Sequence, residues 1–241
     1  YAEPPLGGLR FAPAQLWSRH FNGTFDATRY GPPCHQTTGN WDDSPTETPR
    51  DPDDEPAPAE DCLLLNIFRP RAKSSAPLPV LVWIHGGGLC GGSGSLAWHN
   101  ATKLVARENV IVVTLNYRLG PLGFLALPEL QRTYGANGGG NGFRDQLAAL
   151  RWVKAHIGAF GGDAGGITIF GESSGGVSTC VLNASPEAAG LFRRAIVQSG
   201  PCIVAGEGWG PGSSAYGLEL GANLTKRLGA PTLADLRRLP P

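Results

Sequence analysis

The sequence lacks methionine altogether, and it has neither a net charge nor a long hydrophobic run. Because no methionine stands at position 1 of the 241 residues, we expect the chain to be a processed or excised piece of a longer product. The 20 basic side chains balance the 20 acidic ones, which argues against a strongly basic nucleic-acid-binding surface and against an acidic disordered tail. No apolar run approaches the roughly 18 residues of a membrane-spanning helix. We therefore expect neither a nucleic-acid partner nor a membrane span.

The cysteines are few and widely spaced. None of the five forms a C-x-x-C pair, the spacing typical of zinc sites and thioredoxin-like redox sites. We expect no metal site, and no motif in the sequence calls for a cofactor. An odd number leaves at least one thiol unpaired within the chain. Cys180 and Cys202 flank a predicted helix and strand and could approach each other, but the sequence does not decide this.

Glycine and proline are abundant, with 35 and 21 residues, and they separate short apolar runs. Five runs rich in β-branched residues have strand length, and most are continuous rather than alternating, as expected of strands covered on both faces. Segments with helical spacing lie between and after them. The predicted strands are 63–68, 80–85, 110–116, 167–170 and 195–198, and the predicted helices are 101–108, 144–157, 174–182 and 216–228.

This alternation predicts an α/β fold with a predominantly parallel central sheet and helices on both faces. We find neither an internal repeat nor a second domain. Residues 41–61 are acidic and proline-rich. Because such a segment cannot bury much apolar surface, we expect an exposed loop there.

The strongest chemical signal is the motif G-x-S-x-G, formed by Gly171, Ser173 and Gly175 between a predicted strand and a predicted helix. A serine on such a tight turn needs small neighbours, and its hydroxyl projects above the carboxyl end of the sheet. The following helix directs its first N–H groups toward developing negative charge. The pattern therefore predicts a nucleophile at Ser173. A glycine-rich turn without any chemistry is the alternative, because short motifs are permissive.

A second glycine-rich turn follows another predicted strand. His85 is followed by Gly86, Gly87 and Gly88, and such glycines let backbone N–H groups approach a substrate oxygen closely. This pattern is expected of an oxyanion hole upstream of a serine nucleophile. We assign its donors to the N–H groups of Gly87, Gly88 and Ser174. A phosphate-binding loop is the alternative, but the pattern G-x-x-x-x-G-K-[ST] is absent.

Ordered blocks along nearly the whole chain resemble the type-B carboxylesterase and cholinesterase-like family of α/β-hydrolases. They are the opening segment 1–11, E-D-C-L-L-L-N at 60–66, N-Y-R-L-G at 116–120, D-Q and A-L-R-W-V within 145–153, F-G-G-D at 160–163, G-E-S-S-G-G at 171–176, and G-L-F with A-I-V-Q-S-G within 190–200. A set of blocks in this order is far more specific than any single motif.

The resemblance implies an α/β-hydrolase fold, with residues 1–241 forming the N-terminal portion of a single catalytic domain that is incomplete at its C-terminal end. It also implies a serine carboxylic-ester hydrolase that acts on small-molecule esters through an acyl-enzyme on Ser173. Gly87, Gly88 and Ser174 match the family's oxyanion-hole donors.

The chain departs from the family pattern near these residues. Leu89 stands where an aromatic residue usually follows the glycines. Ser174 replaces the usual alanine, which leaves the backbone N–H in place. Choline-specific relatives carry a tryptophan at the position of Pro52, so choline recognition is not expected.

No histidine follows Ser173. The order of catalytic groups in an α/β-hydrolase is nucleophile, acid and then histidine. We therefore assign neither an acid nor a base within the chain, and we expect the isolated chain to be inactive, because a serine hydroxyl is a weak nucleophile without a base. The five histidines are His20, His35, His85, His99 and His156.

Two alternative functions are compatible with the same fold. The chain could come from a non-catalytic, adhesion-type relative, although such proteins commonly lose the nucleophile that is retained here. A thioesterase, peptidase or lipase would keep the same nucleophile and oxyanion hole.

The resemblance pairs Cys34 with Cys62 in a disulfide, which indicates an oxidising compartment. N-x-[ST] sequons add weaker support, and together these features predict a secreted or ER-luminal protein. The sequence does not indicate an oligomeric state. The candidate glycosylation sites are Asn22, Asn100 and Asn223.

Overall fold

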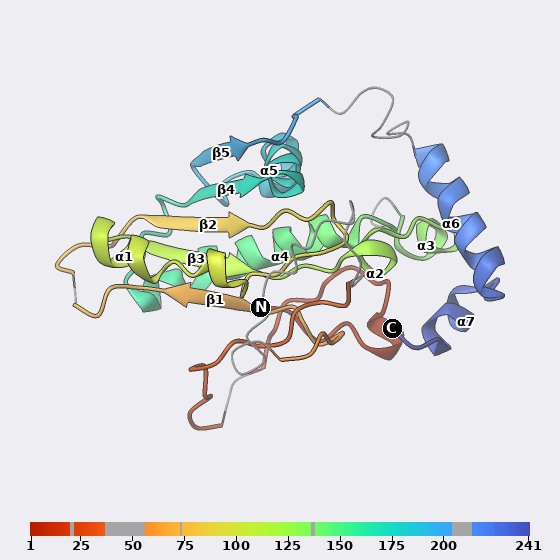
Figure 1. Ribbon diagram of the computed structural model, residues 1–241, viewed down its shortest axis with the longest axis horizontal. Helices are drawn as coiled ribbons and strands as arrows, with labels where there is room; N and C mark the ends of the chain where they lie inside the picture. Colours follow the sequence, from red (N-terminus) through yellow and green to blue (C-terminus); the bar gives the residue numbers. More distant parts are fainter. Residues whose placement is uncertain (20–21, 37–55, 73, 136–137, 204–213) are drawn as a thin grey trace.

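A computed structural model describes residues 1–19, 22–36, 56–72, 74–135, 138–203 and 214–241 (Figure 1). Most of the predicted acidic loop, residues 41–55, lies outside the described residues. The described remainder of that loop, residues 56–61, is exposed or half-buried, in line with its composition.

A five-stranded sheet forms the centre of the molecule, with strand order β1-β3-β2-β4-β5. The strands β2, β3, β4 and β5 are parallel, and β1 pairs with β3 in the antiparallel direction. This arrangement confirms the predicted α/β class and the predominantly parallel sheet. The strands are β1 (Leu65–Phe68), β2 (Val80–Ile84), β3 (Ile111–Leu115), β4 (Thr168–Glu172) and β5 (Arg194–Gln198).

Seven α-helices are described, four of which correspond to the predicted ones. The other three, α2, α3 and α7, are only one or two turns long, so they lack the repeating apolar pattern that reveals a longer helix. The helices are α1 (Thr102–Glu108), α2 (Gly120–Phe124), α3 (Pro128–Tyr134), α4 (Asn141–His156), α5 (Ser174–Ala184), α6 (Ser214–Leu228) and α7 (Leu233–Arg238), and the 3-10 turns are η1 (Gly7–Leu9), η2 (Ala97–His99), η4 (Ile157–Phe160) and η5 (Pro186–Ala188).

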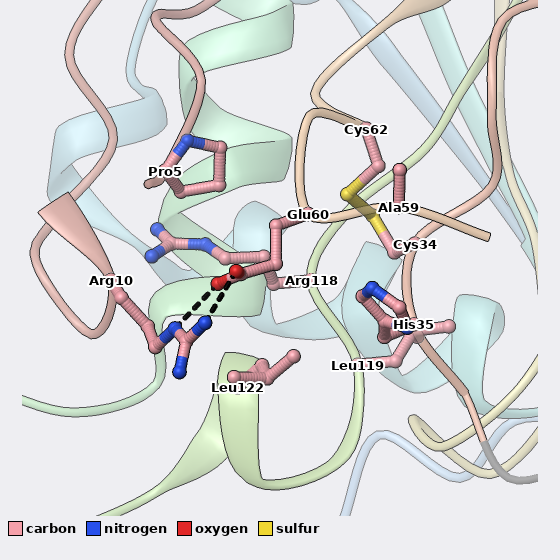
Figure 2. A pocket seen from close by; sticks show the side chains of 10 residues that line it. All are labelled: Pro5, Arg10, Cys34, His35, Ala59, Glu60, Cys62, Arg118, Leu119 and Leu122. Carbon is pink, nitrogen blue, oxygen red and sulfur yellow. Dashed lines mark hydrogen bonds and ion pairs between the residues drawn. A yellow bond between two sulfur atoms is a disulfide. The ribbon is translucent and has the colours of Figure 1, made fainter. Parts of the chain in front are cut away.

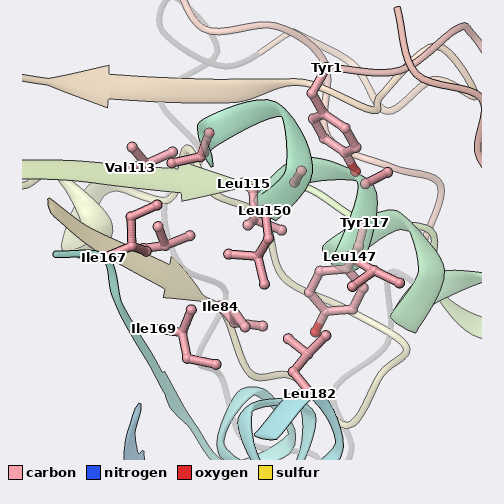
Figure 3. Close-up of a cluster of buried hydrophobic side chains, with 14 of the residues drawn as sticks. Tyr1, Ile84, Val113, Leu115, Tyr117, Leu147, Leu150, Ile167, Ile169 and Leu182 are labelled. Atoms are coloured by element: carbon pink, nitrogen blue, oxygen red, sulfur yellow. The ribbon is translucent and has the colours of Figure 1, made fainter. Parts of the chain in front are cut away.

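Helices cover both faces of the sheet. The strand β2 shows this, because it packs apolar side chains on both of its sides. Val82 and Ile84 pack with Leu150 of α4 and Leu182 of α5 on one face (Figure 3). Leu81 contributes to a separate cluster with α1 on the opposite face. Two-sided burial explains why this strand has a continuous apolar sequence.

The outer strand β5 lies at an exposed edge of the sheet. All five of its residues are exposed, including Ile196 and Val197. Within the described part of the chain, β5 pairs only with β4.

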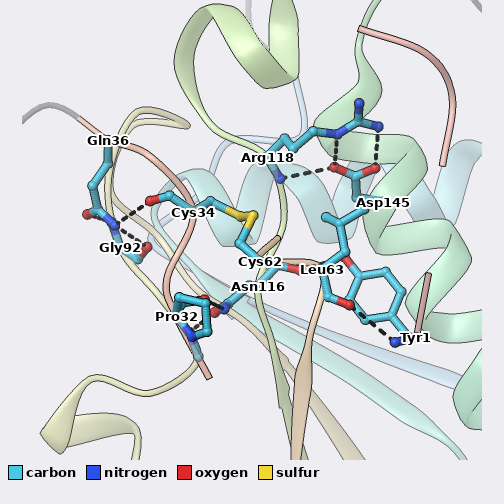
Figure 4. The surroundings of a disulfide bond; sticks show 11 residues. Tyr1, Pro32, Cys34, Gln36, Cys62, Leu63, Gly92, Asn116, Arg118 and Asp145 are labelled. Atoms are coloured by element: carbon cyan, nitrogen blue, oxygen red, sulfur yellow. Dashed lines mark hydrogen bonds and ion pairs between the residues drawn. A yellow bond between two sulfur atoms is a disulfide. The ribbon is translucent and has the colours of Figure 1, made fainter. Parts of the chain in front are cut away.

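A buried ion pair joins the chain after β3 to helix α4. The Arg118 guanidinium donates to Asp145 through Nε at 2.8 Å and Nη2 at 2.7 Å, and its Nη1 donates to the carbonyl of Ala12 (Figure 4). The backbone N–H of Arg118 donates to the same carboxylate at 3.0 Å. The side chains of Arg118 and Asp145 are 5% and 0% exposed, so each charge depends on the other for stabilisation.

Also buried is His85, which follows β2. Its ring stacks on Tyr117 with 4.3 Å between centroids, and its Nδ1 lies 2.8 Å from the carbonyl oxygen of Gly86. Burial lowers the pKa of His85 to about 3, against a smaller opposing effect of the hydrogen bond to Gly86. The imidazole is therefore neutral near pH 7.

We predict that Asp145→Asn lowers the free energy of unfolding by about 3–5 kcal/mol, because it leaves the buried guanidinium without a counter-charge. Glu187→Gln is the matched control, since Glu187 pairs with Arg144 and Arg151 at the surface at 3.4 Å. The control should cost less than about 1 kcal/mol. Urea unfolding measures both values, and equal losses in the two variants would contradict the assignment.

We predict that stability falls as the pH drops below 6.5, the ordinary pKa of histidine. Below that pH the unfolded chain binds a proton at residue 85, whereas the buried His85 of the folded chain stays neutral. At about 1.4 kcal/mol per pH unit, this single group contributes about 2 kcal/mol of loss between pH 7 and pH 5. His85→Gln should remove that share of the slope in urea unfolding. His156→Gln, a change at an exposed histidine, is the control and should keep the wild-type slope.

Candidate active site

The turn between β4 and α5 places Ser173 in a strained backbone conformation. Its φ is 55° and its ψ is −124°, in a region that side chains other than glycine seldom occupy. The N–H of Ser173 donates to Gln198 at 2.9 Å, and its carbonyl accepts from Val177 at 3.0 Å. Strand, turn and helix follow one another as the serine motif predicts, and the side chain is half-buried.

The glycines of the motif are required by close packing. A Cβ at Gly175 would overlap the carbonyl oxygen of Ile84 and would lie 2.7 Å from that of His85. A Cβ at Gly171 would lie 2.5 Å from the carbonyl carbon of Gly175. Real Cβ atoms do not approach other atoms so closely. The first turn of α5 therefore rests directly on the end of β2.

This packing brings the second glycine-rich turn against the serine. A Cβ at Gly86 would lie 3.1 Å from the Cβ of Ser173 and 2.8 Å from the carbonyl oxygen of Glu172. Gly87 and Gly88 follow with φ values of 106° and 61°. The structure thus brings together the two turns that the sequence assigned to one site.

Three backbone N–H groups at this junction have no protein acceptor within the described ranges. They belong to Gly87, Gly88 and Ser174. The first N–H groups of a helix also carry its positive dipole, so the start of α5 favours negative charge beside Ser173. An oxygen that develops negative charge would find donors here.

Hydrogen bonds hold the segment after the glycines. The N–H groups of Cys90 and Gly91 both donate to the carbonyl of Gly87 at 3.0 Å, and the carbonyl of Leu89 accepts from Gly120 at 2.8 Å. The N–H of Leu89 donates to the side-chain Oγ of Ser174 at 3.2 Å. Sequence reasoning used only the N–H of Ser174 and missed this role of its hydroxyl.

The structure joins Cys34 to Cys62 by a disulfide, with 4.9 Å between the two Cα atoms. Two residues later, Gln36 exchanges two hydrogen bonds with the backbone of Gly92, at 2.9 and 3.2 Å (Figure 4). The disulfide therefore fixes a segment that supports the far end of the glycine turn. The predicted loop that it closes falls mostly outside the described residues.

The remaining cysteines are also placed. Cys180 and Cys202 form a second disulfide, which the sequence had left open. Cys90 is a half-buried free thiol, and burial raises its pKa. The three candidate glycosylation residues, Asn22, Asn100 and Asn223, are all exposed.

No histidine in the described part of the chain is hydrogen-bonded to the Ser173 hydroxyl. Glu172, beside Ser173, is exposed, and its Oε2 would lie 3.2 Å from a Cβ at Gly86. Asp163 accepts from the N–H of Gly165 at 2.8 Å, which fits the structural turn role expected for F-G-G-D.

Two pockets are found among the described residues, and neither is lined by Ser173. Figure 2 shows the smaller one, of about 10 Å³, where the guanidinium of Arg10 makes a bidentate pair with Glu60 beside the Cys34–Cys62 disulfide. It has room for roughly one water molecule. A larger cavity of about 300 Å³ has mostly apolar walls from α2, α6 and α7 and reaches Cys90.

Among the residues described, no helix has the length and apolarity needed to cross a membrane. The same residues contain no group of three or more histidine, cysteine or acidic side chains positioned to hold a metal ion.

Curated relatives are esterases from bacteria and mammals. The para-nitrobenzyl esterase of Bacillus subtilis (strain 168) is 47% identical over 203 residues, which cover 83% of this chain and 38% of the relative. The fumonisin B1 esterase of Sphingopyxis macrogoltabida is 40% identical over 229 residues, covering 93% of this chain and 40% of the relative. Carboxylesterase 1D of Mus musculus is 46% identical over 210 residues, or 85% and 35% of the two chains. The chain thus spans about two fifths of the length of these relatives.

Solved structures support the same assignment. A thermophilic PNB esterase superposes with a TM-score of 0.84 at 38% identity, covering 99% of this chain and 46% of that one. This similarity confirms the predicted α/β-hydrolase fold. The model of the carboxylesterase family matches residues 1–208, so the chain belongs to the carboxylesterase family.

Proposed function

We propose that the protein hydrolyses carboxylic esters of small molecules through an acyl-enzyme on Ser173. The observation that carries this proposal is that a strained serine lies at one end of the sheet beside three backbone N–H groups that have no acceptor among the described residues. The membership of the chain in the carboxylesterase family and its esterase relatives add independent support.

In the first step, the Ser173 Oγ attacks the ester carbonyl carbon while a general base takes the hydroxyl proton. The carbonyl oxygen becomes negatively charged, and the N–H groups of Gly87, Gly88 and Ser174 stabilise it. When this intermediate collapses, the base gives the proton to the leaving oxygen, which releases the alcohol and leaves the acyl group on Ser173. Water, activated by the same base, then releases the carboxylic acid. Each oxyanion donor typically contributes about 2.7–4 kcal/mol to the transition state.

The base and its acidic partner are proposed to lie outside these 241 residues. All five histidines precede Ser173, whereas the order for this fold places the acid and the histidine after the nucleophile. His85 does not suit the role, because it is buried and its Nδ1 is engaged by Gly86. Residues 1–241 would then be the N-terminal portion of one catalytic domain.

An oxidising location fits the chemistry of the chain. Two disulfides are present, and the candidate glycosylation residues Asn22, Asn100 and Asn223 are exposed. We propose that the protein is secreted or resides in the ER lumen, where disulfides persist.

We predict that Ser173→Ala abolishes p-nitrophenyl ester hydrolysis by the protein expressed from its complete coding sequence, with a fall in kcat of about 10⁶. A fluorophosphonate probe should label the wild type at Ser173 and leave the variant unlabelled. Ser185→Ala, a change beyond the end of α5, is the control for folding and should keep full activity. A wild-type protein that neither turns over ester nor takes up the probe would instead support a non-catalytic, adhesion-type role.

We predict that a chain of residues 1–241 alone shows no p-nitrophenyl ester turnover above its Ser173→Ala variant, because the general base is missing. The protein from the complete coding sequence serves as the positive control. Turnover by residues 1–241 at a comparable rate would overturn the placement of the base.

A further inference from the structure

The side chain of Ser174 links two parts of the candidate site. Ser174 is the first residue of α5 and is only 4% exposed. Its Oγ accepts the N–H of Leu89, the residue that follows the glycine turn, at 3.2 Å. This bond connects the start of the nucleophile helix to the end of the glycine turn, although the two residues lie 85 positions apart in the chain.

Tyr117 extends the same contact to the other end of the turn. Its hydroxyl donates to the carbonyl of His85 at 2.8 Å, and its ring stacks on the His85 imidazole. Burial raises the pKa of Tyr117, and the neighbouring side chain of Ser174 acts in the opposite direction.

Two hydrogen bonds hold the turn from its two ends. The N–H of Leu89 donates to the Ser174 side chain, and the Tyr117 hydroxyl donates to the carbonyl of His85. His85 and Leu89 directly precede and follow the three glycines. Each end of the turn is therefore anchored to one buried pair of hydroxyl groups.

The turn needs such anchoring. Three consecutive residues, Gly87, Gly88 and Leu89, have φ values of 106°, 61° and 61°. Glycine adopts these values freely, but the left-handed region is unfavourable for a leucine. A hydrogen bond to the leucine N–H opposes relaxation of the Gly88–Leu89 peptide, which adjoins the oxyanion donors.

We propose that the Ser174 hydroxyl, together with Tyr117, is a positioning group that clamps the turn Gly86–Gly88 in the conformation that presents its N–H groups to the substrate oxygen. This role is separate from that of the Ser174 N–H, and it rests on the proposed esterase function. Preorganised donors stabilise a transition state without reorganising during the reaction.

The decisive variant is Ser174→Ala, which removes the hydroxyl and keeps the N–H. In the protein from the complete coding sequence, kcat for p-nitrophenyl ester hydrolysis should fall about threefold to tenfold, the effect of one ordinary hydrogen bond, with KM changed less than twofold. Thr179→Val is the matched control. It removes another buried hydroxyl from α5, one that donates to Gly175 at 2.9 Å, and should leave kcat within twofold.

A double-mutant cycle with Tyr117→Phe tests whether the two hydroxyl groups act as one unit. Because both hydroxyl groups hold the same turn, the double variant should lose little more kcat than the less active of the two single variants. Multiplied losses would show that the two side chains act separately and would overturn the clamp.

Hydrogen exchange at the Leu89 amide gives a readout that does not depend on activity or on the Tyr117 variant. Exchange should be at least threefold faster in Ser174→Ala and unchanged in Thr179→Val. If wild-type ester turnover is present but Ser174→Ala alters neither kcat nor Leu89 exchange, the clamp is wrong and the esterase function stands. If the wild type has no turnover, the proposed function is wrong, and Leu89 exchange still decides whether Ser174 holds the turn.

Discussion

The site depends on one close approach, that of the first turn of α5 to the end of β2. Only a residue without a Cβ fits at Gly175, because the carbonyl oxygens of Ile84 and His85 occupy the space that a side chain would need. The same contact forces Ser173 into its left-handed conformation and brings Gly86 against the serine Cβ. The candidate nucleophile and the proposed anion-binding turn are therefore not two independent motifs. They are the two sides of one packing contact between neighbouring parallel strands.

Several elements outside that contact hold the segment that follows the glycine turn. Gln36, fixed close to the Cys34–Cys62 disulfide, binds Gly92, and Asn116 at the end of β3 accepts from Gly94 at 2.8 Å. The disulfide thus supports the site indirectly, through Gln36, and makes no contact with Ser173. A rigid environment of this kind suits backbone donors, because the side chain of a residue does not set the orientation of its own peptide N–H.

Much of this arrangement could be predicted from the sequence, and the exceptions have physical causes. The strands were visible because β2 is covered on both faces, and the two glycine turns were visible because local steric demands determine their residue types. The hydroxyl of Ser174 was missed, because its partner Leu89 is distant in the chain and a serine in place of alanine has no local signature.

Arg10 connects the two ends of the chain, and this bears on the order in which the molecule is assembled. Its guanidinium binds Glu60 and also the carbonyl of Leu239, 229 positions away, while Arg237 donates to the carbonyl of Arg10. During synthesis, Glu60 leaves the ribosome early, but Leu239 follows Arg10 by about 10 to 50 seconds at ordinary rates of translation. Arg10 can therefore bond Leu239 and Arg237 only after α7 has emerged from the ribosome.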